Sequence, residues 1–389
     1  MQTKRVLVCS SHLPDYDRAS GSLRIFHLVE LLQEAGWAVS FLAHDATGGE
    51  RYAKILQQRG VAVYAGPKSV MAGDEYLSDA TELIANGRFD LAILAFWYIA
   101  EQYLPLIRSL SPDTRVVVDS IDLHFLRQSR RTFQRSSRAQ LPGVLRSEDG
   151  YDIIGELNAY AAADAVLTVS QKEADLLNDW LADPQMAQAV PDMEDLSLSK
   201  LPLVERKGIS FIGNFRHPPN IEAVRYLCRE ILPLLDPAVL VQHPLYLVGN
   251  DPDGVLSEYA RDLAGVQAVG WVPSVLPYLE RARLSVVPLR YGAGTKRKLI
   301  QTLMLGTPCV SSSIGIEGLH LTAGEEVLVA DDPTSFAQAI TRLVKEPELW
   351  QKLAAQGHAQ VVQTHSREAV RHRFLAVVEQ LTCVPFPGE

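Results

Sequence analysis

Residues 284–306 read LSVVPLRYGAGTKRKLIQTLMLG, and three local patterns follow one another in this stretch. The apolar run Leu284 to Leu289 predicts a buried strand, and the apolar residues that recur from 299 to 304 predict one face of a helix. Thr295 is placed to cap that helix, and Gly306 ends it. The stretch therefore predicts a strand, a glycine-containing loop and a helix.

The predicted helix begins with three cations, Lys296, Arg297 and Lys298. A helix N-terminus already carries partial positive charge, so cations there are unfavourable unless an anion compensates. Gly292 and Gly294 allow a ligand to approach the backbone N–H groups, and loops of this kind after a parallel strand bind phosphate. The segment indicates a phosphate site, and a solvated basic turn is the alternative interpretation.

Strands and helices alternate on both sides of this segment, which is typical of doubly wound parallel sheets. Strands are predicted at 6–9, 37–43, 61–64, 91–94, 115–119 and 165–169, and then at 209–213, 245–249, 266–269, 309–312 and 327–330. A stretch with prolines, acids and serines but no sustained periodicity separates the two series. We expect two Rossmann-like α/β domains, at 1–185 and 208–365, joined by a linker at 186–207. A last helix within 366–389 is expected to cross back to the first domain.

The composition fits two ordinary globular domains. The chain has 389 residues, of which 47% are hydrophobic and 21% charged, so it can fill two cores. Its net charge of -9 disfavours nucleic acid as a partner. The four cysteines lie far apart, which favours a reduced compartment. No apolar run resembles a signal peptide or approaches the roughly 20 residues that span a bilayer. These features predict a cytoplasmic protein, at most peripheral to the inner face of the membrane.

Several segments of the second half occur in an order that resembles retaining glycosyltransferase family four, the group 1 glycosyltransferases. They are FIGNFR at 211–216, PN at 219–220, LVGN at 247–250, VGWVP at 269–273, GTPCV at 306–310 and IGIEGL at 314–319. With the glycine loop they span nearly the whole second domain. The family has the GT-B architecture, two Rossmann-like domains that face each other across a cleft, and the resemblance implies that fold here. It places the acceptor on the first domain and the donor on the second.

The resemblance also implies an activity. A sugar would be transferred from a nucleoside diphosphate sugar with retention of the anomeric configuration, and without a metal or cofactor. Preorganised cations would stabilise the negative charge that builds on the leaving diphosphate. Arg216 and Lys298 are the first candidates for this catalytic role. The residues expected to bind the donor are Gly21, Asn214, Gly249, Trp271, Val272, Gly294, Thr295, Lys296, Arg297, Gln301, Glu317, Gly318 and Leu319.

Three positions depart from the family's pattern. Ala293 and Gln301 stand where the family usually has two glutamates; Gln301 can hydrogen-bond a ribose hydroxyl but supplies no charge. Asn214 stands where many relatives have an arginine, and Arg216 would supply that charge from two positions along. Two alternatives therefore stay open: a nucleotide-sugar epimerase of the same fold, and a nucleotide-sugar-binding protein with weakened catalysis.

In the first domain, polar residues follow two predicted strands at the edge where such folds bind ligands. Gly21 lies in Ser20–Ser22, just before a helix predicted at 23–35, and would let a diphosphate or an acceptor approach the backbone. A simple serine N-cap is the other interpretation. Asp122 and His124 follow the strand at 115–119. The resemblance implies that a histidine or an acid from this region reaches the donor sugar or the acceptor, so both are candidate catalytic residues.

The acceptor stays open, since a glycan, a lipid-linked molecule or a small molecule would each suit such a cleft. From Arg127 to Arg146 the chain carries six arginines and no acid. This stretch would suit peripheral contact with anionic lipid or a phosphorylated acceptor. A solvated helix and loop is favoured, because the stretch lacks a broad apolar face. By analogy with the family, we expect a role in polysaccharide or glycoconjugate biosynthesis.

Overall fold

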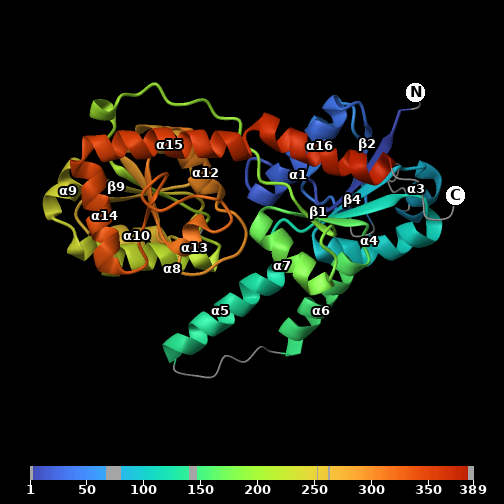
Figure 1. Ribbon diagram of the computed structural model, residues 1–389, viewed down its shortest axis with the longest axis horizontal. Helices are drawn as coiled ribbons and strands as arrows, with labels where there is room; N and C mark the ends of the chain where they lie inside the picture. The colour runs from blue at the N-terminus through green and yellow to red at the C-terminus, as the bar shows by residue number, and fades with distance from the viewer. Residues whose placement is uncertain (1–2, 67–79, 140–146, 252, 262, 384–389) are drawn as a thin grey trace. The chain divides into compact units, whose positions relative to one another are not determined.

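The computed structural model describes residues 3–66, 80–139, 147–251, 253–261 and 263–383, apart from the side chains of 131 and 133–149. The chain forms two compact units. Unit 1 comprises residues 1–193 together with 370–389, and unit 2 comprises residues 194–369. Each unit contains a parallel sheet with helices packed against it (Figure 1).

Unit 1 is built on a seven-stranded sheet with the order β3-β2-β1-β4-β5-β6-β7. The strands are β1 (Arg5–His12), β2 (Ala38–Asp45), β3 (Ala62–Ala65), β4 (Leu91–Ala95), β5 (Arg115–Asp119), β6 (Ala165–Thr168) and β7 (Ala187–Ala189). The helices are α1 (Ser20–Glu34), α2 (Glu50–Gln58), α3 (Ala80–Gly87), α4 (Trp97–Leu110), α5 (His124–Ala139), α6 (Ser147–Ala161), α7 (Gln171–Leu181) and α16 (Arg367–Cys383). All strand pairs are parallel, so their carboxyl ends share one edge.

Helix α16 is distant in sequence from the rest of unit 1 but contributes to its core. Val370, Phe374 and Val378 are 0–2% exposed and pack in one cluster with side chains of β1, β2 and α1. Lys4 Nζ donates to Thr382 Oγ1 at 3.0 Å, which ties the start of the sheet to the end of this helix. Unit 1 is therefore assembled from two separate stretches of chain.

Unit 2 has a six-stranded parallel sheet with the order β10-β9-β8-β11-β12-β13. The strands are β8 (Ile209–Ile212), β9 (Leu245–Val248), β10 (Val266–Gly270), β11 (Leu284–Val287), β12 (Cys309–Ser311) and β13 (Leu328–Val329). The helices are α8 (Pro218–Tyr226), α9 (Pro237–Gln242), α10 (Val255–Arg261), α11 (Leu276–Arg281), α12 (Arg297–Met304), α13 (Ser313–Ile316), α14 (Pro333–Lys345) and α15 (Pro347–His365). Short 3-10 and π turns lie at 203–205 and 227–234.

Most predicted strands are confirmed within two residues, because continuous apolar runs in a chain of this class form buried parallel strands. The structure also has a strand, β7, inside the stretch 186–207 that was predicted as a linker. Ser20, Gly21 and Ser22 are the first three residues of α1, so the prediction that they precede the helix was wrong. The cap predicted at Thr295 was wrong as well: Lys296 is the N-cap of α12, and no side chain caps it.

Candidate functional site

In unit 2 the chain changes direction across the sheet between β8 and β11, which lie side by side at its centre. Ligands of doubly wound sheets bind at the carboxyl ends of the strands at such a point. The loops that follow β8, β9, β10, β11 and β12 all lie at this edge, because the sheet is parallel throughout. The predicted donor-binding residues of unit 2 come from these loops and from the first turns of α12.

Backbones approach each other unusually closely where β8 and β9 end. A Cβ atom on Gly249 would lie 1.7 Å from the carbonyl oxygen of Gly213, and the φ angle of Gly249 is 139°. Gly213 N donates to Val248 O at 3.0 Å, and Gly249 N donates to Gly270 O at 2.8 Å. Only glycine fits at 249, since any side chain would collide with a main chain that is itself fixed. Gly249 thus allows the chain to pass close to Gly213 at this edge of the sheet.

Lys298, in the first turn of α12, contacts residues of β8 and α8. Its Nζ donates to Asn220 Oδ1 at 2.6 Å, and Asn220 Nδ2 donates to Asn214 O at 2.9 Å. The amine also sits 5.1 Å from the centroid of the Phe211 ring. Desolvation by burial, reinforced by Lys296, lowers the pKa of Lys298 to about 7. The chain therefore holds a cation, at a cost, next to the first turn of α8.

The other two cations of this helix start have partners within unit 2. Arg297 forms an ion pair with the buried carboxylate of Glu194. Lys296 Nζ donates to the carbonyl oxygens of Ala293, at 3.3 Å, and Gly294. The positive charge at the helix N-terminus is thus partly balanced by groups of the protein itself. The anion expected from the sequence is needed for only part of this charge.

Arg216 differs from these cations because its guanidinium has no hydrogen-bond or ion-pair partner in the described part of the chain. It is exposed on the loop between β8 and α8, and its backbone N–H donates to Asn214 Oδ1 at 3.1 Å. Arg290, on the β11 loop, is instead paired with Glu222 and covers the Tyr226 ring at 4.0 Å. Arg216 is therefore the cation most available to a ligand at this edge.

The remaining predicted residues occupy the same edge in different ways. Trp271 is 66% exposed on the loop after β10, and Val272 packs beside it against a small apolar cluster. Gln301 is half-buried on α12. Glu317 and Gly318 follow the single-turn helix α13, whereas the Leu319 side chain is buried, which leaves only its backbone for contact with a ligand. These residues thus lie at the same edge with different degrees of exposure, and their contact with a donor stays a prediction.

In unit 1 the equivalent change of direction falls between β1 and β4. Gly21, in the first turn of α1, lies against two residues with left-handed backbone: Phe96 with φ 74° and Ile121 with φ 61°. A Cβ on Gly21 would lie 3.2 Å from Ile121 Cγ2 and 3.6 Å from Phe96 Cζ. Positive φ in bulky residues costs energy and is concentrated at functional sites. Three loops therefore converge here at some conformational cost.

Asp122 and His124 lie at this convergence and contact each other. His124 Nε2 is 3.2 Å from Asp122 Oδ1, and Arg127 pairs with the same carboxylate. Two partners of His124 were not predicted from the sequence. Trp97 Nε1 donates to His124 Nδ1 at 3.1 Å, and the buried Glu156 accepts from the His124 backbone N–H at 2.8 Å. The cluster FWY at 96–98, directly after a buried strand, was the signal that could have revealed the first.

Asp119 proves to be a structural residue. It is fully buried, and the single N–H of Arg24 Nε is shared between its two carboxylate oxygens, at 3.0 and 2.9 Å. Arg24 also donates to Val190 O at 2.7 Å, which fastens α1 to the segment that leaves unit 1. Burial raises the pKa of Asp119 despite the attraction of Arg24.

Two family models match the chain, one in each unit. The model described as a glycosyl transferase 4-like domain matches residues 21–192, and the model described as glycosyl transferases group 1 matches residues 206–346. Both agree with the two parallel sheets described above. The chain belongs to the GT-B glycosyltransferases.

Solved structures share the fold of this glycosyltransferase. Sucrose-phosphate synthase from Thermosynechococcus elongatus matches with a TM-score of 0.72 at 19% identity, covering 98% of this chain and 99% of that one. HepE of Anabaena in complex with UDP-glucose has a TM-score of 0.66 at 12% identity, with 97% and 99% covered. A mutant of S. aureus TarM in complex with Fondaparinux, alpha-GlcNAc-glycerol and UDP has a TM-score of 0.68 at 10% identity, with 98% and 100% covered.

A curated relative is described as an uncharacterized 44.6 kDa protein in the cps region of Klebsiella pneumoniae. It is 25% identical to this glycosyltransferase over 194 residues. The match covers 47% of each chain, so it spans about half of that relative's length.

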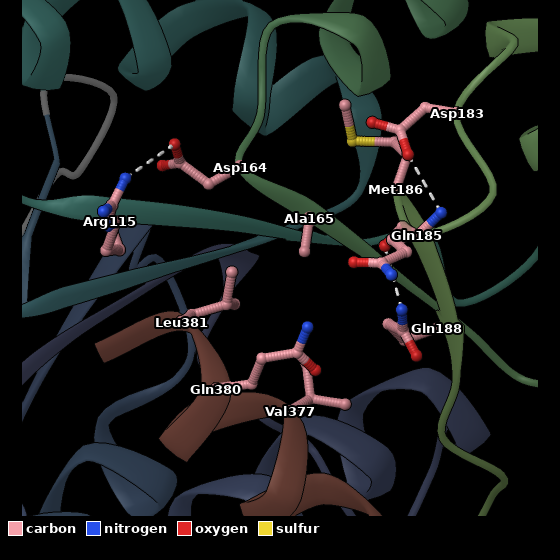
Figure 2. A pocket seen from close by; sticks show the side chains of 10 residues that line it. All are labelled: Arg115, Asp164, Ala165, Asp183, Gln185, Met186, Gln188, Val377, Gln380 and Leu381. Atoms are coloured by element: carbon pink, nitrogen blue, oxygen red, sulfur yellow. Dashed lines mark hydrogen bonds and ion pairs between the residues drawn. The ribbon is translucent and has the colours of Figure 1, made fainter. Parts of the chain in front are cut away.

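A pocket in unit 1 of the glycosyltransferase lies at the opposite, amino-terminal edge of its sheet. Figure 2 shows Arg115 and Asp164 near the starts of β5 and β6, with Gln380 and Leu381 of α16 across from them. Asp164 is already shared by Arg108 and Arg115 and accepts from Val116 N–H at 2.6 Å. No predicted site residue lines this pocket.

Predictions about metals, membranes and cysteines concern parts of the chain that the structure describes only in part. Within the described residues, no group of three or more His, Cys, Asp or Glu residues is arranged to hold a metal ion, and no helix is both long and apolar enough to cross a membrane. Cys9, Cys228 and Cys309 are buried free thiols, and Cys383 is exposed. Much of the stretch from Arg127 to Arg146 lies outside the described side chains, so membrane contact through it stays a prediction.

Proposed function

We propose that this glycosyltransferase moves a sugar from a nucleoside diphosphate sugar to a glycan acceptor, with retention of configuration and with no metal or cofactor. The observation that carries the donor half is the set of groups at the β8 and β11 ends: Lys298 on Asn220, the exposed Arg216 and the close backbone at Gly249. Cations fixed in place before the reaction stabilise charge without reorganising.

The chemistry assigned to these residues is departure of the nucleoside diphosphate. As the bond to the sugar breaks, negative charge grows on the leaving phosphate oxygens. Arg216 can offer a bidentate contact to such oxygens, and Lys298 a point charge. Gln301 is proposed to hydrogen-bond the ribose, and the backbone of Glu317, Gly318 and Leu319 to contact the sugar. Asp122 and His124, in unit 1, are proposed to lie on the acceptor side.

The relatives are consistent with both halves of this proposal. HepE is seen with UDP-glucose, and TarM with UDP and alpha-GlcNAc-glycerol. The Klebsiella relative comes from a cps region, which supports a role in polysaccharide biosynthesis. A uridine nucleotide is therefore the first donor class to assay.

The test is calorimetric binding of UDP to the full chain in the presence of EDTA. Arg216→Gln and Lys298→Gln should each weaken binding about tenfold or more, because a hydrogen bond to a charged group contributes about 1.5–3 kcal/mol. Arg225→Gln is the matched control, since Arg225 is a partly exposed cation of α8 that pairs with Glu222 at 3.7 Å. Equal affinity in all four proteins would remove the site assignment.

Activity separates transfer from the alternatives. Incubation with UDP-sugars and oligosaccharide acceptors should yield a glycoside whose anomeric configuration, read by NMR, equals that of the donor. Interconversion of the donor sugar without an acceptor would indicate an epimerase instead. Tight nucleotide binding with neither product would indicate a binding protein.

A further inference from the structure

The Trp97 side chain reaches one nitrogen of the His124 ring, and a carboxylate lies at the other. Trp97 Nε1 is 3.1 Å from His124 Nδ1, and Asp122 Oδ1 is 3.2 Å from His124 Nε2. The three residues come from two loops of unit 1, since Trp97 begins α4 while Asp122 and His124 lie where α5 begins. Both ring nitrogens are therefore engaged by other side chains.

The chemistry of indole decides where the imidazole proton lies. An indole N–H is a donor and never an acceptor, so Nδ1 of His124 must offer its lone pair to Trp97. In a neutral imidazole the proton is then on Nε2, which is the nitrogen that faces Asp122. The opposite tautomer would set two N–H groups against each other at Trp97 and leave a lone pair facing a carboxylate.

We propose that Trp97 is a positioning residue that holds His124 as the Nε2–H tautomer and directs the ring proton towards Asp122. His124 then acts as a hydrogen-bond donor, with no free lone pair to take a proton from an acceptor hydroxyl. The effect on catalysis rests on the function proposed above, which places Asp122 and His124 on the acceptor side. The tautomer itself does not depend on that function.

The surroundings hold this arrangement in place. Glu156 accepts from the backbone N–H of His124 at 2.8 Å and of Phe125 at 2.7 Å. These two hydrogen bonds fix the start of α5. Phe96, whose positive φ directs the chain into α4, has its ring centroid 6.0 Å from that of His124. Tyr98 flanks the same ring at 6.2 Å.

In the described part of α5 and α6, polar groups near His124 are paired with one another. Arg127 binds the Asp122 carboxylate that faces Nε2, and Tyr160 donates to Glu156 at 2.9 Å. Burial raises the pKa of Glu156, and its two oxygens already accept from the His124 and Phe125 amides and from Tyr160. In this arrangement Trp97 at Nδ1 and Asp122 at Nε2 favour the same tautomer, with Trp97 excluding the proton from Nδ1.

The experiment is a two-bond 1H–15N correlation spectrum of the full chain with 15N-labelled histidine, at a pH of about 8. Ten histidines contribute signals, and loss of one set in His124→Gln assigns His124. We expect a pyrrole-type Nε2 and a pyridine-type Nδ1 in the native protein. In Trp97→Phe, which keeps an aromatic ring but removes the N–H, both shifts should move towards a tautomer average. A native Nδ1 of pyrrole type, or an unchanged pattern in Trp97→Phe, overturns the proposal.

Trp350→Phe is the matched control. Trp350 also donates from a buried indole, to Arg283 O at 2.6 Å, but it lies in unit 2. It should leave the His124 signals and kcat unchanged. Trp97→Phe should lower kcat at least fivefold with the donor KM within twofold, and an unchanged kcat would contradict the role in catalysis. If the native protein transfers no sugar, the function fails, while the tautomer measured in the same sample stands or falls separately.

Discussion

Lys298 is the residue at which stability and ligand binding conflict most clearly. Burial and Lys296 lower its pKa to about 7, from an ordinary value near 10.5. Between these values the unfolded chain binds more protons than the folded one, so this group makes stability rise with pH across that window. Below pH 7 both states are protonated, and the full cost of burying the charge remains.

Lys298→Met should therefore raise the melting temperature at a pH of about 6.5 and gain less at about pH 9.5. Differential scanning calorimetry at the two pH values measures this. Lys207→Met is the control, because Lys207 is exposed and its removal should shift both temperatures little. A variant that melts below the native protein at both pH values would show that the Asn220 hydrogen bond outweighs the desolvation cost.

Because of the same residue, the affinity for nucleotide should change with pH in the opposite direction to stability. A bound diphosphate favours the charged amine, so binding takes up a proton wherever free Lys298 is neutral. Affinity for UDP should then be flat below about pH 7 and fall by up to tenfold per pH unit above it. Calorimetry from about pH 6 to 9 tests this, with Lys298→Gln as reference. Parallel pH profiles for the two proteins would contradict it.

Sequence alone indicated Lys298 but not the group that holds it. Asn220 lies 78 residues away in the chain, and its amide meets Lys298 only because β8 and β11 are neighbours in the sheet. Trp97 was missed for the same reason, because its partner follows a different strand. Local patterns report on spacing within a helix or strand, and contacts between loops depend on strand order.

The close approach of the backbones where β8 and β9 end supplies a prediction about an element end. Gly249→Ala should destabilise unit 2 by about 3 kcal/mol or more, since backbone strain of about 1–3 kcal/mol adds to a collision with Gly213 O. Gly254→Ala, with φ 67° but nothing within 4 Å, should cost about 1 kcal/mol. Urea unfolding measures the loss of stability in each variant. Similar losses in the two would show that the close approach at Gly249 adds no cost.

Helix α5 begins on a carboxylate from another helix. Glu156→Ala removes the acceptor of the His124 and Phe125 amides and should cost about 1–2 kcal/mol, as loss of a helix cap does. Hydrogen exchange of those two amides should accelerate more than that of amides elsewhere in unit 1. As a comparison, Asp332→Ala removes the N-cap of α14, which accepts from Ser335 N at 2.9 Å, and should affect unit 2 only.

At the scale of elements, apolar runs predicted the strands well, and the exceptions have physical reasons. β7 has the sequence AQA, too short and too polar for a periodicity to appear, and it forms by pairing with β6. At α12 the sequence indicated uncompensated cations, but Glu194 and two carbonyl oxygens receive them. Such partners are tertiary, so no pattern within the helix could predict them.

For the whole molecule, length and alternating patterns were enough to predict two α/β domains, and the structure has two such units. Their composition leads to a fragment prediction. Residues 194–369 form one continuous unit and should fold alone. Residues 1–193 lack Val370, Phe374 and Val378, whose burial contributes about 1.5–3 kcal/mol each, comparable in sum to the stability of a domain.

Circular dichroism and thermal melting of the two fragments provide the measurement. Fragment 194–369 should melt cooperatively, whereas fragment 1–193 should aggregate or unfold without a transition. Addition of a peptide of residues 367–389 should restore its cooperativity. A stable fragment 1–193 would mean that α16 adds little to the core of unit 1.

The place of α16 in unit 1 has a further consequence for how the protein is made. The N-terminus of a chain emerges from the ribosome first, and domains fold as their residues emerge. The residues of unit 2 are all synthesised before Val370, Phe374 and Val378 exist, so the second unit can be complete while the first still lacks part of its core. The growing chain therefore finishes its N-terminal unit last, and until α16 emerges the apolar face that it covers is open to chaperones.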